Sequence, residues 1–209
     1  MRRDRRLPLD TLAPYLYEPK LGLLDWAALF GNEQPVEIEV GFGKGMFLVS
    51  AATARPDLNF LGIEIARKYQ LYTADRLTRR ELRNVRVACA DAKIVFRDHV
   101  PPGSVATVHV YFPDPWWKKR HMKRRLFTPE FAALAERILQ PDGLLRIATD
   151  VEEYFQVITA IMAERPGFAP LPIEPPQEAR HDLDYLTNFE RKYRRQGKPI
   201  HRAVYRKAP

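Results

Sequence analysis

The chain has 209 residues, which is long enough for one domain with a sizeable core and short for two. Apolar residues make up 45% of it, and no run of about 18 apolar residues occurs, which excludes a membrane-spanning helix. Its formal net charge is +8, and such a balance favours a polyanionic partner such as nucleic acid.

The amino-terminal segment begins with four arginines within residues 2–6 but has no apolar stretch behind them, so we do not expect a secretory signal. We expect residues 1–34 to form a basic arm and a short helix that stops at Gly31, and residues 35–209 to form the main domain. The single cysteine, Cys89, has no internal disulfide partner, which fits a cytoplasmic protein.

From residue 35 onwards, strand and helix patterns alternate in short steps. Strands are expected at residues 36–40, 59–65, 85–89, 105–112 and 144–148, and helices from the first glycine-rich turn to about Ala54, up to Arg80, and at residues 128–139 and 150–162. A bent edge strand within 166–178, some helix within 179–197 and a last strand at 200–205 complete the chain. This order predicts an α/β fold of Rossmann-like type, with a mostly parallel twisted sheet and helices on both faces.

The first strand runs into a turn with glycines at positions 41, 43 and 45, preceded by Glu39. Glycines let the backbone turn tightly and let a ligand approach it. A dinucleotide fingerprint would need a further glycine where Met46 stands, and a phosphate-binding P-loop would need Ser or Thr after Lys44. The remaining pattern, Glu-x-Gly-x-Gly-x-Gly, favours an S-adenosylmethionine site and disfavours a nicotinamide oxidoreductase.

Acidic residues stand where that cofactor needs them. Glu64 closes the second strand, about 20 residues after the turn, where a carboxylate can bridge a ribose diol. Asp91 follows the third strand and is placed to receive the adenine amino group, while Glu39 lies before the turn. Each acid could alternatively be a helix cap or a surface carboxylate, but an acid-lined site suits a cofactor that carries a sulfonium and an ammonium and no phosphate.

The fourth strand ends in Pro113, Asp114, Pro115 and two tryptophans, followed by six cations within residues 118–125. The flanking prolines restrict the backbone of Asp114. Aromatic rings can stack a nucleobase and cations can hold phosphates, so this block predicts a site that works on a base. A basic run by itself would more often be a solvated surface.

These blocks, together with residues 187–190 and the basic tail, resemble the bacterial tRNA (guanine-N7-)-methyltransferases over residues 36–205. The resemblance implies the class I methyltransferase fold and a guanine target in the tRNA variable loop. It implies that Glu39, Glu64 and Asp91 bind the cofactor, with the glycine turn (Gly41, Gly43, Gly45), and that Asp114 is the active-site carboxylate. It further implies substrate contacts from Lys118, Asp150, Thr187, Asn188, Phe189 and Glu190, and RNA contacts from Arg120, His121, Lys123, Arg124 and Arg125.

Guanine N7 already presents a lone pair, so we expect catalysis by positioning and by the charge of Asp114, with Asp150 and Glu190 in support. Asp150 could also cap the helix that follows it. We expect His109 to be a core residue, and the histidine and cysteine spacing predicts no metal site. Two alternatives remain: methylation of an exocyclic amine, although a second proline is missing after Asp114, and a nucleic-acid-binding module with a vestigial cofactor site.

Overall fold

The computed structural model describes residues 7–20, 22–116, 119–173 and 187–209. Across these residues one eight-stranded sheet forms the centre of the molecule, in the order β1-β4-β3-β2-β5-β6-β8-β7. The strands are β1 (Leu16–Tyr17), β2 (Val36–Val40), β3 (Asn59–Glu64), β4 (Val85–Cys89), β5 (Val105–Tyr111), β6 (Leu139–Thr149), β7 (Phe168–Leu171) and β8 (His201–Lys207). Strands β1 to β6 pair in parallel, and β8 pairs antiparallel with β6 and β7. The expected mostly parallel α/β sheet is therefore confirmed.

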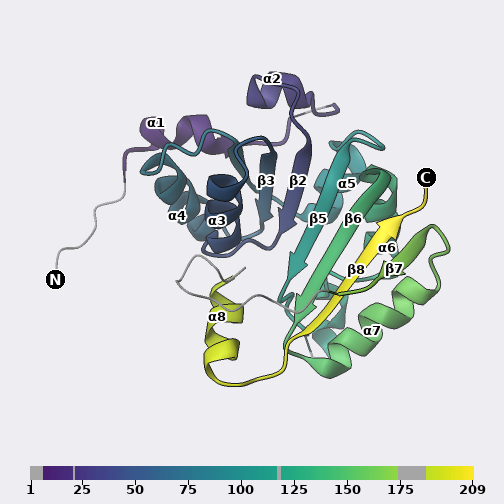
Figure 1. Ribbon diagram of the computed structural model, residues 1–209. Helices are drawn as coiled ribbons and strands as arrows, with labels where there is room; N and C mark the ends of the chain where they lie inside the picture. Colours follow the sequence, from purple (N-terminus) through teal and green to yellow (C-terminus); the bar gives the residue numbers. More distant parts are fainter. Residues whose placement is uncertain (1–6, 21, 117–118, 174–186) are drawn as a thin grey trace.

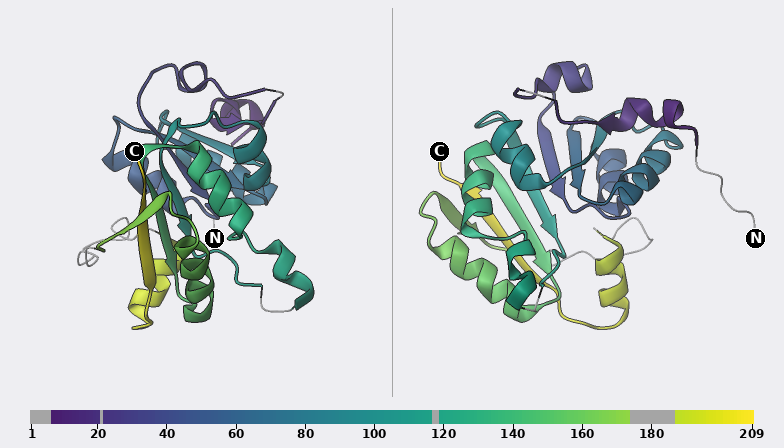
Figure 2. Two further views of the ribbon diagram at one scale, coloured as in Figure 1. Left: turned by 90° about the vertical axis from the view of Figure 1, so that its right-hand side faces the viewer. Right: turned by 180° about the vertical axis from the view of Figure 1, so that it is seen from behind.

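Helices cover both faces of this sheet, as Figure 1 shows and as Figure 2 shows from the side and from behind. They are α1 (Leu9–Leu12), α2 (Trp26–Phe30), α3 (Met46–Ala54), α4 (Arg67–Thr78), α5 (Ala92–Asp98), α6 (Pro129–Ile138), α7 (Glu152–Ala163) and α8 (Asn188–Arg195), with 3-10 turns η1 (Ala13–Tyr15) and η2 (Lys119–Arg124). One core cluster joins α5, α6 and α7 to the sheet, and a second joins α1, α3 and α4 to its other face.

Alternation along β2 and β5 assigns side chains to these two faces. Val36, Ile38 and Val40 of β2 belong to the core under α5 and α6. The intervening Glu37 and Glu39 therefore point to the α3 face, although both are buried. A central strand with two buried carboxylates is unusual, because a buried charge costs free energy unless it is paired.

Several helix boundaries follow from local capping chemistry. Thr128 caps α6, since its hydroxyl accepts from the backbone N–H of Phe131 at 3.2 Å, and Pro129 occupies the first helical position, as expected. The proposed cap at Asp150 is wrong: α7 begins one residue later, and the residue at its N-cap is Val151, whose side chain makes no capping hydrogen bond. Asp150 is thereby left available for other contacts.

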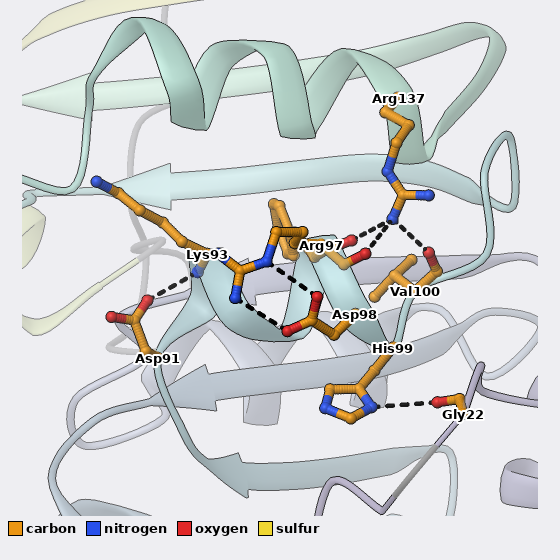
Figure 3. Close-up of polar contacts among 9 residues, drawn as sticks. Gly22, Asp91, Lys93, Arg97, Asp98, His99, Val100 and Arg137 are labelled. Carbon is orange, nitrogen blue, oxygen red and sulfur yellow. Dashed lines mark hydrogen bonds and ion pairs between the residues drawn. The ribbon is translucent and has the colours of Figure 1, made fainter.

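Among the elements that were not expected from the sequence, two connect distant segments of the chain. Helix α5 begins after Asp91 and is fixed by its neighbours, as Figure 3 shows: Arg137 of α6 donates to the carbonyls of Phe96, Arg97 and Val100. The imidazole Nδ1 of His99 lies 3.1 Å from the carbonyl oxygen of Gly22. The second is the short strand β1, which adds the segment before residue 35 to the edge of the sheet.

Strand β6 also begins earlier than expected. Leu139 pairs with Val105 and Leu144 with Thr107, so residues 140–143 form an irregularity within the strand. No helix in the described part of the chain is long and apolar enough to cross a bilayer.

Glycine at position 45 is required by both backbone conformation and space. Its φ is +64°, and a Cβ added there would lie 2.2 Å from the Cγ2 atom of Thr73 on α4. Gly103 has the same φ of +64° but nothing within 4 Å of an added Cβ. Substitutions at Gly45 and Gly103 therefore share the same backbone strain, and only the one at Gly45 adds steric overlap.

We predict that Gly103→Ala lowers the free energy of unfolding by about 1 kcal/mol through the left-handed backbone alone. Gly45→Ala should lose about 1–3 kcal/mol more, because the overlap with Thr73 adds to the same strain. Urea unfolding followed by circular dichroism measures both values. Equal losses in the two variants would show that α4 moves aside freely.

Candidate active site

Five carboxylates follow five neighbouring parallel strands at one edge of the sheet. In spatial order they are Asp91 after β4, Glu64 at the end of β3, Glu39 near the end of β2, Asp114 after β5 and Asp150 after β6. Neighbouring strands lie about 4.8 Å apart, so this edge concentrates negative charge. The strand order reverses at β2: β3 and β4 follow on one side of it, and β5 and β6 lie on the other. Open α/β sheets bind ligands at such a reversal.

The glycine turn between β2 and α3 fixes the position of Glu64. Gly41, Gly43 and Gly45 have φ values of 78°, 51° and 64°, all in the left-handed region. This path lets the N–H of Gly43 donate to Oε2 of Glu64 at 3.1 Å, while the N–H of Ala66 donates to Oε1 at 3.0 Å. The carboxylate of Glu64 is therefore held across the turn from β2.

Glu39 is the most unusual of the five acids. It is 3% exposed, and among the described residues its Oε2 atom has no hydrogen-bond partner. Burial raises the pKa of Glu39 well above its ordinary value of 4.5, and the negative charge of Glu64 raises it further. A buried oxygen without a hydrogen-bond donor is costly in free energy, which makes Glu39 a candidate for contact with an external cation or hydrogen-bond donor.

Asp91 is exposed and caps α5, since its Oδ1 atom accepts from the N–H of Lys93 at 2.8 Å (Figure 3). The helix-cap interpretation that the sequence left open is thus correct for this residue. One oxygen is engaged in the cap, and a carboxylate offers further acceptor capacity through its second oxygen. Its place beside the end of β3 keeps it in line with Glu64.

Asp114 is exposed and lies in a loop with a strained backbone. Phe112 and Trp116, on either side of it, have φ values of 53° and 42°, which side-chain-bearing residues rarely adopt. Two hydrogen bonds to backbone carbonyls hold the loop: the N–H of Phe112 donates to the carbonyl of Ala148 at 2.7 Å, and the side-chain Nε of Arg125 donates to the carbonyl of Pro115 at 2.7 Å. The carboxylate is thus placed at the end of β5 by the backbone on both sides.

Helix α8 packs against this loop. The ring centroids of Phe189 and Tyr193 each lie 5.8 Å from that of Phe112. Tyr193 is also hydrogen-bonded to Asp150, and burial followed by this contact raises the pKa of its hydroxyl. Figure 1 shows α8 at the end of the sheet to which the parallel strands point. Segments separated by more than 70 positions in the chain therefore meet at the carboxylate edge.

The four residues 187–190 occupy different environments. Thr187 caps α8, its hydroxyl accepting from the N–H of Glu190 at 3.0 Å. Asn188 accepts from Arg191 at 3.2 Å, and Phe189 is 52% exposed. Glu190 is 2% exposed and pairs with Arg202 of β8 at 2.7 Å, so its carboxylate ties α8 to the sheet.

The cationic block contributes exposed guanidinium groups beside Trp116. Arg120 and Arg124 are exposed, and the guanidinium of Arg124 lies 5.2 Å from the Trp116 ring centroid. The His121 ring contacts the same indole edge-on, at 5.6 Å between centroids. Lys118 lies outside the described residues, as does the side chain of Lys123. No group of three or more metal-ligating side chains occurs in the described ranges.

Sequence reasoning missed three residues of this region: Phe112, Tyr193 and Tyr111. Their rings are ordinary core candidates in the sequence, and only the contact between α8 and β5 gives Phe112 and Tyr193 a place at the site. His109 is buried at 2% exposure within the sheet, as expected. A signal for Tyr193 existed in its spacing of four residues from Phe189, which places both on one face of α8.

Comparisons of the sequence with known proteins identify the family of the chain. A family model described as a putative methyltransferase matches residues 33–203. A tRNA (guanine-N(7)-)-methyltransferase of Rhodopirellula baltica is 46% identical over 86% of this chain and 68% of its own. One of Vibrio cholerae is 40% identical over 87% of this chain and 75% of its own.

Solved structures confirm the fold. The 16S rRNA methyltransferase KamB superposes with a TM-score of 0.65 at 15% identity, covering 91% of this chain and 96% of that one. An S-adenosylmethionine-dependent O-methyltransferase of Thermotoga maritima gives a TM-score of 0.56 at 13% identity, covering 88% of this chain and 63% of that one. By its sequence, the chain belongs to the tRNA (guanine-N(7)-)-methyltransferase family.

Proposed function

We propose that this chain transfers a methyl group from S-adenosylmethionine to N7 of a guanine in the variable loop of tRNA, in the cytoplasm. The names of the relatives reported above specify a methyltransferase that acts on guanine N7 of tRNA. For this chain, the proposal rests mainly on Glu39, whose buried Oε2 atom has no hydrogen-bond partner among the described residues and which lies one strand away from the restrained Asp114. A site for a cationic donor and a site for its acceptor thus lie side by side.

The residues present fit the cofactor. Glu39 would receive its ammonium group, because Oε2 is buried and no donor within the described ranges reaches it. Glu64, already fixed by two backbone N–H groups, would accept from the ribose hydroxyls, and Asp91 would accept from the adenine amino group. The left-handed turn through Gly41, Gly43 and Gly45 removes side chains from the path of the ligand. When bound, the cofactor would supply an electrophilic methyl group on its sulfonium.

Asp114 would hold the target base. Its exposed carboxylate can accept from guanine N1–H and the 2-amino group, which selects guanine over adenine. The same negative charge stabilises the positive charge that develops on the imidazole half of the base as N7 is methylated. No base catalyst is needed to free N7, so the protein contributes orientation and electrostatics.

The remaining site residues would position the RNA. The exposed ring of Phe189 offers a face for stacking a base, and Asp150 is held by Tyr193. Thr187 and Glu190 would act by fixing α8, with Asn188 at its first turn. Arg120, His121, Arg124 and Arg125 would contact phosphates together with Lys118 and Lys123.

The proposed function is tested by incubating the protein with unmodified tRNA and a donor carrying an isotopically labelled methyl group. Digestion and mass spectrometry should locate one labelled methyl on guanine N7 in the variable loop. A label on an exocyclic amine would favour the alternative acceptor chemistry. Absence of any label together with absence of donor binding would favour a binding module.

The Glu39→Gln variant should be more stable than wild type at mildly alkaline pH and should bind the cofactor more weakly. Glu39 has a raised folded-state pKa, so it stabilises the native state fully below 4.5, and this contribution is lost as pH rises through the raised value. Glutamine carries no charge at any pH, so the variant keeps its stability as the pH rises. We therefore predict an unfolding free energy about 1–2 kcal/mol above wild type at mildly alkaline pH, and no gain at acid pH.

The same variant should bind S-adenosylhomocysteine at least about tenfold more weakly, because an amide cannot compensate an ammonium. Calorimetry and denaturant unfolding across pH measure the two effects. The exposed Glu33→Gln serves as control and should change neither. A Glu39→Gln protein that keeps full affinity would remove Glu39 from the cofactor site.

Asp114→Asn should lower kcat on tRNA by about a hundredfold or more, because the amide keeps the shape of the side chain but not its charge. Affinity for S-adenosylhomocysteine should stay within about twofold, since Asp114 lies on the substrate side. Asp57→Asn, at an exposed position preceding β3, is the matched control. Survival of turnover in the Asp114 variant would show that the assigned role is wrong.

A further inference from the structure

A chain of buried polar groups runs under α3 from the protein surface towards Glu39. The guanidinium of Arg55 donates to Oε1 of Glu37 at 2.8 Å. Oε2 of Glu37 lies 2.8 Å from Nε2 of His109, and Nδ1 of His109 lies 2.8 Å from the hydroxyl of Tyr111. Glu37, His109 and Tyr111 are all at most 9% exposed. They lie on β2 and β5, on the same face as Glu39.

The direction of each hydrogen bond follows from charge. Burial alone would raise the pKa of Glu37, but its contacts with His109 and Arg55 outweigh burial and lower it, so Glu37 is a carboxylate that only accepts. His109 must therefore present its proton at Nε2. Burial lowers the pKa of His109, which keeps the ring neutral and leaves a lone pair on Nδ1. That lone pair accepts the proton of the Tyr111 hydroxyl.

This arrangement has a consequence for Glu39. His109 lies opposite Glu39 in the register of β2 and β5, and Tyr111 follows His109 by two positions on the same face of β5. A tyrosine hydroxyl carries a single proton, and here that proton points to His109. The Tyr111 hydroxyl, on the strand next to Glu39, therefore donates to His109 and not to Glu39, which agrees with the unpartnered Oε2 atom.

We propose that Glu37, His109 and Tyr111 are positioning residues that turn the hydroxyl proton of Tyr111 away from Glu39 and so keep Glu39 ready to receive the ammonium group of the cofactor. The inference rests on the proposed function for the identity of that ligand. The free energy of the unpartnered oxygen is recovered when a cation binds, so the chain pre-organises the site without touching the ligand.

The isosteric change Glu37→Gln tests the proposal, because it reverses the whole chain. The charged donor Arg55 should take the amide oxygen, which leaves the amide NH2 facing His109. His109 must then accept at Nε2 and carry its proton on Nδ1, from which it donates to the oxygen of Tyr111. The Tyr111 hydroxyl then no longer donates to His109 and can donate a hydrogen bond to Glu39.

The measurements are calorimetric titrations of S-adenosylhomocysteine into wild type, Glu37→Gln, Tyr111→Phe and the double variant. We predict that Glu37→Gln binds about tenfold more weakly, since one buried hydrogen bond to Glu39 must first break. Tyr111→Phe alone should bind within about twofold of wild type. The double variant should regain wild-type affinity, because no hydroxyl remains to occupy Glu39.

Rescue in the double variant distinguishes positioning from a purely structural role, since two structural defects would add instead of cancelling. Steady-state kinetics should agree: Glu37→Gln raises the KM for S-adenosylmethionine and leaves kcat nearly unchanged. Full affinity in Glu37→Gln, or no rescue by Tyr111→Phe, overturns the proposal. So does a Tyr111→Phe protein that binds as weakly as Glu37→Gln.

Nitrogen-15 NMR of labelled histidine provides a readout that needs no ligand. Wild-type His109 should show a neutral ring with its proton on Nε2, and Glu37→Gln should move that proton to Nδ1. A proton on Nδ1 in the wild type overturns the proposal even if the glutamine variant fails to fold. Wild-type protein with the expected tautomer but no affinity for S-adenosylhomocysteine would contradict the proposed function instead.

Discussion

The alignment of five parallel strands that each end beside a carboxylate is the constraint on which this structure depends. Placing β4, β3, β2, β5 and β6 side by side brings five acids to one edge. Neighbouring like charges repel, and the field of Glu64 contributes to the raised pKa of Glu39. A cationic ligand bound at this edge would supply the partner that the buried Oε2 atom of Glu39 lacks among the described residues.

The fold restrains these acids to different degrees. Glu64 is fixed by two backbone N–H groups of the turns around it, and Asp91 by its own helix cap. Among the described residues Glu39 has no such partner at Oε2, although the buried His109 lies opposite it in the register of β2 and β5. Asp114 is held through its backbone, between two residues with left-handed φ. The strain, of the order of 1–2 kcal/mol for each such residue, is balanced by the packing of Phe112 against α8.

Much of the site could be predicted from local sequence, because its residues follow strand ends in recognisable motifs. The positions of Glu39, Glu64, Asp91 and Asp114 at one sheet edge follow from the alternation of strands and helices alone. The limits of β2 and β4 agree with the expectation residue for residue.

What could not be predicted depends on contacts between distant segments. Helix α5 lacks a strong periodic pattern of its own and is fixed by Arg137 of α6, 40 positions away from Arg97. The cap of α7 was misassigned because Asp150 has the right residue type, whereas its side chain is engaged by Tyr193 from α8. Likewise, nothing in the spacing of Glu37 and His109, 72 positions apart, indicates that they form a buried pair.

A crystal structure with S-adenosylhomocysteine would show whether a ligand cation occupies the buried oxygen of Glu39. We expect the ligand's amino group within about 3 Å of Oε2 of Glu39, with Tyr111 still bonded to His109. An amino group that lies elsewhere, while Glu39 stays unpartnered or takes the Tyr111 hydroxyl, would show that Glu39 does not receive the ligand cation.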